Sequence, residues 1–148
     1  MLIGSGHWTG RGRFLYEGQS LGSVVELKFE SIRDTHGEHL EGTLQPEGGE
    51  AHEFAVRILE DETGTFTVTA AGMSPNLVGT AKLESEPHLA MLWSEDTTAM
   101  ASVALFSTGR GVGCRGFYRR PVGVVTWELV LTPNVPVRRG NNVVSLRR

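Results

Sequence analysis

Alternation of apolar and polar residues runs through almost the whole chain. Between residues 23 and 32, Val25, Leu27 and Phe29 occupy every second position, and charged residues fill most of the positions between them. Successive side chains of a β-strand point to opposite faces, so this pattern predicts a strand with one buried face. No window of 11 or more residues has the 3.6-residue period of an amphipathic helix.

The same alternation predicts nine or ten strands, separated by turn-like segments about every 8–12 residues. The predicted strands cover residues 6–16, 23–32, 38–44, 52–60, 65–70, 78–85, 114–119 and 123–132, with a hairpin over residues 89–106 that turns at residues 95–98. Every connection is short enough for a hairpin, which favours a meander over a sandwich. We therefore expect an all-β protein with a single antiparallel up-and-down β-barrel of about 8–10 strands, closed so that no edge strand remains.

The hairpin over residues 89–106 differs from the other strands because both of its faces are apolar. Leu89, Met91 and Trp93 alternate with Ala90 and Leu92. A sheet whose outer face is exposed to water normally has one apolar face and one polar face. We therefore expect one face to line the interior and the other to be covered by a partner, a lid or the tail. A homodimer through residues 89–106 is one such arrangement.

The length of 148 residues fits one domain with a real core. We assign residues 1–132 to the barrel and residues 133–148 to a basic tail or a short closing strand. The single cysteine, Cys114, and an N-terminus without basic and apolar leader regions predict a cytoplasmic protein. The longest apolar run is too short to span a membrane.

Charge is distributed unevenly along the chain, whose net charge is −3. Residues 1–106 carry 16 acidic and 6 basic residues, whereas residues 107–148 carry 8 arginines and one acidic residue, Glu128. Either acidic and basic strands become neighbours when the sheet closes, or the arginines form a patch for an anionic ligand. We expect no nucleic-acid partner.

The sequence lacks the spacing of a known catalytic or metal site. His36, His39 and His52 fall in a turn and on two strands, where nothing brings them together, so we expect no metal. There is no G-x-S-x-G, H-E-x-x-H or P-loop motif. Cys114 has no histidine partner that the sequence can assign, and it is expected to be a buried strand residue.

The first strand contains Gly6-His7-Trp8-Thr9-Gly10-Arg11-Gly12, which fits G-x-W-x-G-x-G. With the meander that follows, the chain resembles the calycin-type barrels, which include the lipocalins and fatty-acid-binding proteins, and most closely the nitrobindin-like branch. The resemblance implies a barrel with Trp8 near its closed end and an apolar ligand inside. Nitrobindins hold haem through a histidine near the C-terminus. This chain has no histidine after His88, so we expect no cofactor; Tyr118 or Cys114 would be the alternative haem ligands.

Aromatic and methionine side chains supply area and adaptable shape for an apolar ligand. The candidate ligand-binding residues are Trp8, Met91, Trp93, Met100, Phe106, Arg115, Tyr118 and Trp127. Arg115 or Arg119 is the candidate anchor for an acidic head group. The alternative interpretation is that the apolar residues fill a packed core. The expected function is the binding of a small apolar or amphipathic molecule. The alternatives are a barrel enzyme, a cyclase or isomerase that shapes a hydrophobic substrate, and a non-catalytic homodimeric interaction protein.

Overall fold

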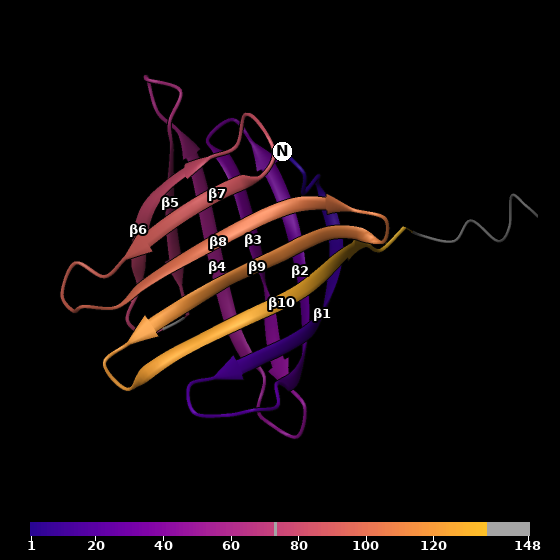
Figure 1. The fold of residues 1–148 in the computed structure, drawn as a ribbon. Coiled ribbons are helices and arrows are strands. Elements are labelled where there is room, and N and C mark those ends of the chain that lie inside the picture. The colour runs from indigo at the N-terminus through magenta and orange to yellow at the C-terminus, as the bar shows by residue number, and fades with distance from the viewer. Residues whose placement is uncertain (73, 136–148) are drawn as a thin grey trace, which may run out of the picture.

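Each strand of the protein pairs with the strands before and after it in the sequence, and the first strand also pairs with the last. The computed structural model describes residues 1–72 and 74–135. The strands are β1 (Gly6–Tyr16), β2 (Ser23–Asp34), β3 (Gly37–Pro46), β4 (His52–Glu60), β5 (Phe66–Ala71), β6 (Leu77–Lys82), β7 (His88–Trp93), β8 (Met100–Thr108), β9 (Gly111–Arg120) and β10 (Gly123–Pro133). All pairs are antiparallel, and the sheet closes between β1 and β10 (Figure 1). The predicted all-β, up-and-down barrel is therefore confirmed, and the described residues contain no helix.

The barrel has two distinguishable ends. The N-terminal end carries residues 1–5 and the turns that follow β2, β4, β6 and β8, and the opposite end carries the turns that follow the odd-numbered strands up to β9. Most strand limits lie within three residues of the predicted ones. The largest differences are at β6, which ends at Lys82 instead of residue 85, and at β9, which starts at Gly111 instead of residue 114. The connection after β6 contains Pro87, which has no N–H to donate to a ladder.

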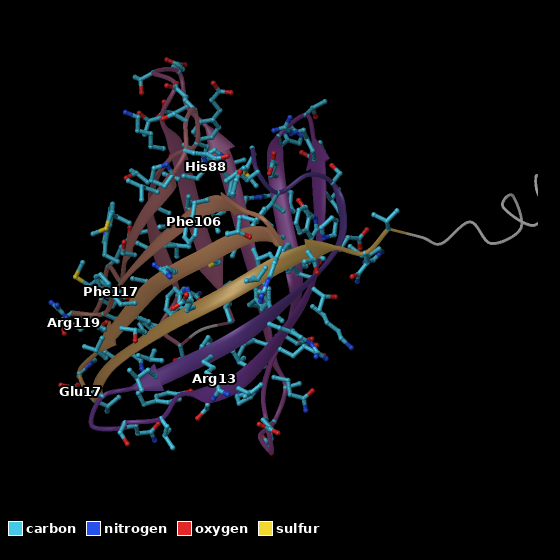
Figure 2. The ribbon with its side chains drawn as sticks, turned by 45° about the vertical axis from the view of Figure 1, so that its right-hand side comes forward. Arg13, Glu17, His88, Phe106, Phe117 and Arg119 are labelled. Atoms are coloured by element: carbon cyan, nitrogen blue, oxygen red, sulfur yellow. The ribbon has the colours of Figure 1, made fainter. Side chains whose placement is uncertain are left out.

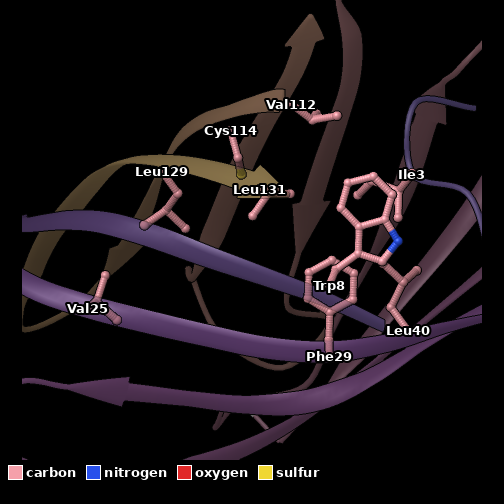
Figure 3. Close-up of a cluster of buried hydrophobic side chains, with 9 residues drawn as sticks. All are labelled: Ile3, Trp8, Val25, Phe29, Leu40, Val112, Cys114, Leu129 and Leu131. Atoms are coloured by element: carbon pink, nitrogen blue, oxygen red, sulfur yellow. The ribbon is translucent and has the colours of Figure 1, made fainter. Parts of the chain in front are cut away.

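One of two clusters of buried residues centres on Trp8 of β1 and includes residues of β2 and β10. Trp8 stacks on Phe29, with 6.3 Å between ring centroids and 8° between planes, and its indole N–H donates to the carbonyl of Gly4 at 2.8 Å. Ile3 packs beside this pair (Figure 3). Burial of apolar side chains of this size contributes about 1.5–3 kcal/mol each. The short segment before β1 is thus tied to the core by a hydrogen bond and by a buried isoleucine.

Two inward-facing glycines of β1 let neighbouring strands approach closely. A Cβ on Gly12 would lie 1.9 Å from the backbone oxygen of Glu128 on β10, and one on Gly10 would lie 2.6 Å from a methyl group of Leu131. Strands of a tightly coiled barrel come this close only where a side chain is missing. The glycine spacing of the first strand therefore has a packing reason.

The C-terminal segment is described only in part. Strand β10 ends at Pro133, and the backbone N–H of Asn134 still donates to the carbonyl of His7 at 2.8 Å. The basic residues from 136 onward, expected as a tail or a closing strand, lie outside the described residues. Closure of the barrel is achieved by β10 itself.

We predict that Gly12→Ala lowers the free energy of unfolding by about 1–3 kcal/mol, because the new methyl group forces β1 and β10 apart. Gly109→Ala is the matched control, since a Cβ there meets nothing within 4 Å. Its effect should stay within about 0.5 kcal/mol. Urea titrations followed by tryptophan fluorescence measure both values, and equal stabilities of the two variants would contradict the close approach.

Candidate functional site

A cavity of about 250 Å³ lies inside the barrel. Its wall is built from inward side chains of several strands, among them Phe54 and Val56 of β4 and Val103 and Leu105 of β8. Except for His88, every residue in the wall is apolar or is the cysteine Cys114. A cavity with such a wall stays dry and favours apolar guests.

The cavity exists because one side of the barrel carries short side chains. Ala70, Ala81, Ala90 and Ala101, on four successive strands from β5 to β8, all line it. On the other side, the large side chains around Trp8 fill the interior. Inward residues of a barrel fill its lumen only where their volumes suffice. The alanines therefore leave space that the aromatic residues of β1 and β2 do not occupy.

His88 is the polar residue of the cavity wall. It lies at the start of β7 and is 6% exposed (Figure 2). Its Nδ1 lies 3.0 Å from the carbonyl oxygen of Ser85 and therefore carries the proton that it donates, while Nε2 accepts from the backbone N–H of Leu2 at 3.1 Å. Both ring nitrogens thus have partners. The sequence did indicate the inward position of His88, since alternation places it on the same face of the strand as Ala90 and Leu92. As a polar residue, however, it was not among the candidates for an apolar binding site.

Residues 1–5 close the N-terminal end of the cavity. Met1 and Ile3 form part of the wall, and Leu2 is fastened to His88 by the hydrogen bond just described. The carbonyl of Gly4 accepts from Trp8. Movement of this segment would therefore open the cavity without breaking any strand pairing.

Three of the eight candidate residues face inward. Trp127 lines the cavity, with its ring over Gly116, where a Cβ would lie 2.6 Å from the ring. Trp8 belongs to the filled part of the core. Tyr118 packs in a second cluster of buried residues, where burial raises its pKa above the ordinary tyrosine value.

The other five candidates, Met91, Trp93, Met100, Phe106 and Arg115, lie on the outer face of the barrel. The side chains of β7 that face inward are His88, Ala90 and Leu92, so Met91 and Trp93 face outward and are 44% and 45% exposed. The structure thus places Trp93, expected beside the ligand together with Trp127, on the opposite face of the sheet. Both faces of β7 are apolar, so alternation alone could not choose between them.

The arginines expected to anchor an acidic ligand are also outside the barrel. Arg115 forms an ion pair with Glu128 at 2.6 Å, and its guanidinium lies 5.6 Å from the ring centroid of Phe106. Arg119 lies on the same outer side of β9, over Phe117 (Figure 2). Neither arginine lines the cavity.

The structure offers no site that suits haem among its described residues. The cavity volume is far below that of a porphyrin, and both nitrogens of His88 are already hydrogen-bonded. Tyr118 and Cys114, the alternative ligands, are packed in two different clusters. In the described part of the chain, no three histidine, cysteine or acidic side chains are grouped to hold a metal ion.

Comparisons of the chain with protein-family models, with curated proteins and with solved structures found no match. Within residues 1–72 and 74–135, no helix is long and apolar enough to cross a membrane. From its structure, the protein is a closed ten-stranded antiparallel β-barrel with an apolar lumen.

We predict that the thiol of Cys114 is inert in the folded protein. Burial raises its pKa from 9.0 to about 11, so almost no thiolate forms at pH 8. An aromatic disulfide reagent should label Cys114 only after unfolding in urea. Because the unfolded thiol ionises first, the contribution of Cys114 to stability should be lost as the pH rises from about 9 to about 11. Rapid labelling of the native protein at pH 8 would contradict this burial.

Proposed function

We propose that the barrel binds a small apolar or amphipathic molecule in its lumen. The observation that carries the proposal is the cavity of about 250 Å³ inside the barrel, whose described wall contains one polar side chain, that of His88. An apolar cavity of about 150 Å³ engineered in another protein holds benzene. By that measure, the lumen has room for a ligand portion on the order of ten non-hydrogen atoms.

The likeness to calycin-type barrels supports the same function. The G-x-W-x-G-x-G stretch lies on β1, with Trp8 buried near the N-terminal end and Gly12 at a close strand contact. In the barrels that this chain resembles, the lumen receives apolar ligands. Ligand binding is favoured over a cyclase or isomerase because the titratable side chains in the described part of the cavity wall are the hydrogen-bonded His88 and the protonated Cys114.

Filling the lumen should abolish binding without unfolding the barrel. In Ala101→Leu, the larger side chain extends into the cavity, because Ala101 lines it and is 4% exposed. Ala104→Leu is the matched control, since residue 104 has the opposite parity on the same strand. We expect naphthalene to raise the melting temperature of the native protein and of Ala104→Leu, but not that of Ala101→Leu.

Two results of this experiment would count against the lumen as the binding site. One is the absence of any melting-temperature shift with naphthalene in the native protein. The other is an equal shift in both leucine variants, which would place the probe outside the barrel. Circular dichroism of each variant, with an unchanged β spectrum, confirms that the barrel is intact.

Self-association through the outer face of β7 and β8 is a second candidate function. The outward residues of these strands carry no charge: they are Leu89, Met91, Trp93, Met100, Ser102, Ala104 and Phe106. Leu89, Met91 and Trp93 are each more than two-fifths exposed. An isologous dimer places a surface against its own copy, which an uncharged apolar surface tolerates without repulsion. A second copy of this chain is therefore the occupant that we propose for this face.

The register determines which substitution tests the dimer. Ala101 and Val103 face inward, so Ala104→Glu is the variant that places a charge on the outer face. We expect the native protein to sediment as a dimer at micromolar concentration and Ala104→Glu as a folded monomer. A native protein that sediments as a monomer would exclude this candidate.

A further inference from the structure

A second, larger hollow lies against the lumen at the N-terminal end of the barrel. It measures about 620 Å³ and is bounded by the turns after β2 and β4. Met1, Ile58 and Leu83 belong to the walls of both this hollow and the lumen. Three apolar side chains, one of them on the short segment before β1, therefore separate the two spaces. We call the outer space the vestibule.

The vestibule is strongly acidic. Its described lining contains the carboxylates of Asp34, Glu38, Glu60, Asp61 and Glu62. The cations that face them are Arg33 and the α-amino group of Met1, which leaves a net charge of −3 with His36 neutral. A concave surface with an excess of one sign concentrates ligands of the opposite sign. The lumen below it is apolar, so the two spaces together match an amphipathic cation.

The hydrogen bonding of the Glu38 carboxylate is a second observation, independent of this charge count. Its side chain lies on β3, is 7% exposed, and lines both the vestibule and a small pocket beneath residues 1–5. One oxygen, Oε1, accepts two hydrogen bonds from the guanidinium of Arg33. The other oxygen, Oε2, is buried and has no hydrogen-bond partner among the described residues.

A buried carboxylate oxygen without a donor is costly, and native proteins satisfy nearly all such groups. Glu38 lines a small pocket together with Met1, Ile3, Gly4 and Ser5 of the N-terminal segment. A ligand head group that displaces Met1 would reach it. The matching partner is therefore a hydrogen-bond donor, and the surrounding carboxylates favour one that is positively charged.

We infer that the ligand of the lumen is a cationic amphiphile: an amine or ammonium head group held by Glu38 in the vestibule and a short apolar body in the cavity. This inference rests on the proposed lumen function and adds the chemistry of the head group. A primary ammonium carries three donors and no acceptor, which suits a carboxylate oxygen that lacks a donor. A divalent metal ion is a poorer match, since no three potential ligand side chains are grouped within the described residues.

The same geometry argues against an acidic ligand. A carboxylate head in the vestibule would meet five carboxylates, of which only Glu38 is paired with Arg33. Arg115 and Arg119 of β9, which could have balanced such a head, lie on the outside of the barrel. The charge of the ligand is thus set by the turns at the N-terminal end, and not by Arg115 or Arg119.

Three octyl compounds with different head groups test the inference by calorimetry at pH 7: octylamine, octanol and octanoate. They share an eight-carbon body, which the lumen can hold, and at this pH octylamine is an ammonium. We expect octylamine to bind about ten- to a hundredfold more tightly than octanol, as one hydrogen bond to a charged group implies, and octanoate to bind most weakly.

Substitution of Glu38 isolates the head-group contact. Glu38→Gln should remove most of the advantage of octylamine while leaving the affinity for octanol within about twofold. Glu47→Gln removes the same charge from an exposed turn at the opposite end of the barrel and should change neither affinity. If Glu38→Gln fails to fold, a variant with Glu60→Gln and Glu62→Gln, both at exposed positions, provides the test. It should bind octylamine more weakly and octanol unchanged, and added salt should reduce the difference in octylamine affinity between this variant and the native protein.

The outcomes separate this inference from the function on which it rests. Equal affinity for octylamine and octanol, or tighter binding of octanoate, would overturn the cationic head group and leave the lumen function standing. If octylamine still binds to Ala101→Leu, the head-group site stands, but the apolar body of the ligand does not lie in the lumen. If none of the three compounds binds the native protein, both proposals fall.

Discussion

Closure of the sheet between β1 and β10 is the constraint on which the rest of the structure depends. The pairing runs from Trp8 opposite Pro133 to Tyr16 opposite Val125, so it joins residues more than one hundred positions apart. Without it the meander would have two free edges and an open interior. Gly12 makes this pairing sterically possible, because the backbone of β10 occupies the space of the missing side chain. The lumen, the vestibule and the plug formed by residues 1–5 all depend on this one junction.

The interior that closure creates is filled unevenly. Aromatic stacking of Trp8 on Phe29 and the buried aliphatic residues around it fill the part next to β1, β2 and β10. Alanines on β5 to β8 leave the rest of the lumen partly empty. A void of this kind forfeits dispersion contacts, and protein interiors normally contain few of them. A guest of suitable size would restore those contacts, which is the physical reason for assigning the space to a ligand.

The charged groups discussed above lie in two places, on the outer face of the barrel and at its N-terminal end. On the outer face, Arg115 pairs with Glu128 and lies over Phe106, and Arg119 lies over Phe117, so these two arginines do not line the lumen. At the N-terminal end, acidic turns surround a carboxylate with one unpaired oxygen. The acidic turns thus lie at the N-terminal end of the barrel, whereas Arg115 and Arg119 lie on its side.

The sequence by itself determined the fold class, a count of nine or ten strands and the identity of most inward residues, because two-residue alternation and short turns depend on local chemistry alone. It could not choose the inner face of β7, where Met91 and Leu92 are equally apolar. Only the tertiary structure decided that Trp93 faces outward, since parity there follows from the pairing of β7 with β6 and β8. The contact of His88 with Leu2, 86 positions away in the sequence, was likewise decided by the tertiary structure. Contacts between residues distant in sequence leave no periodic signal in any one strand.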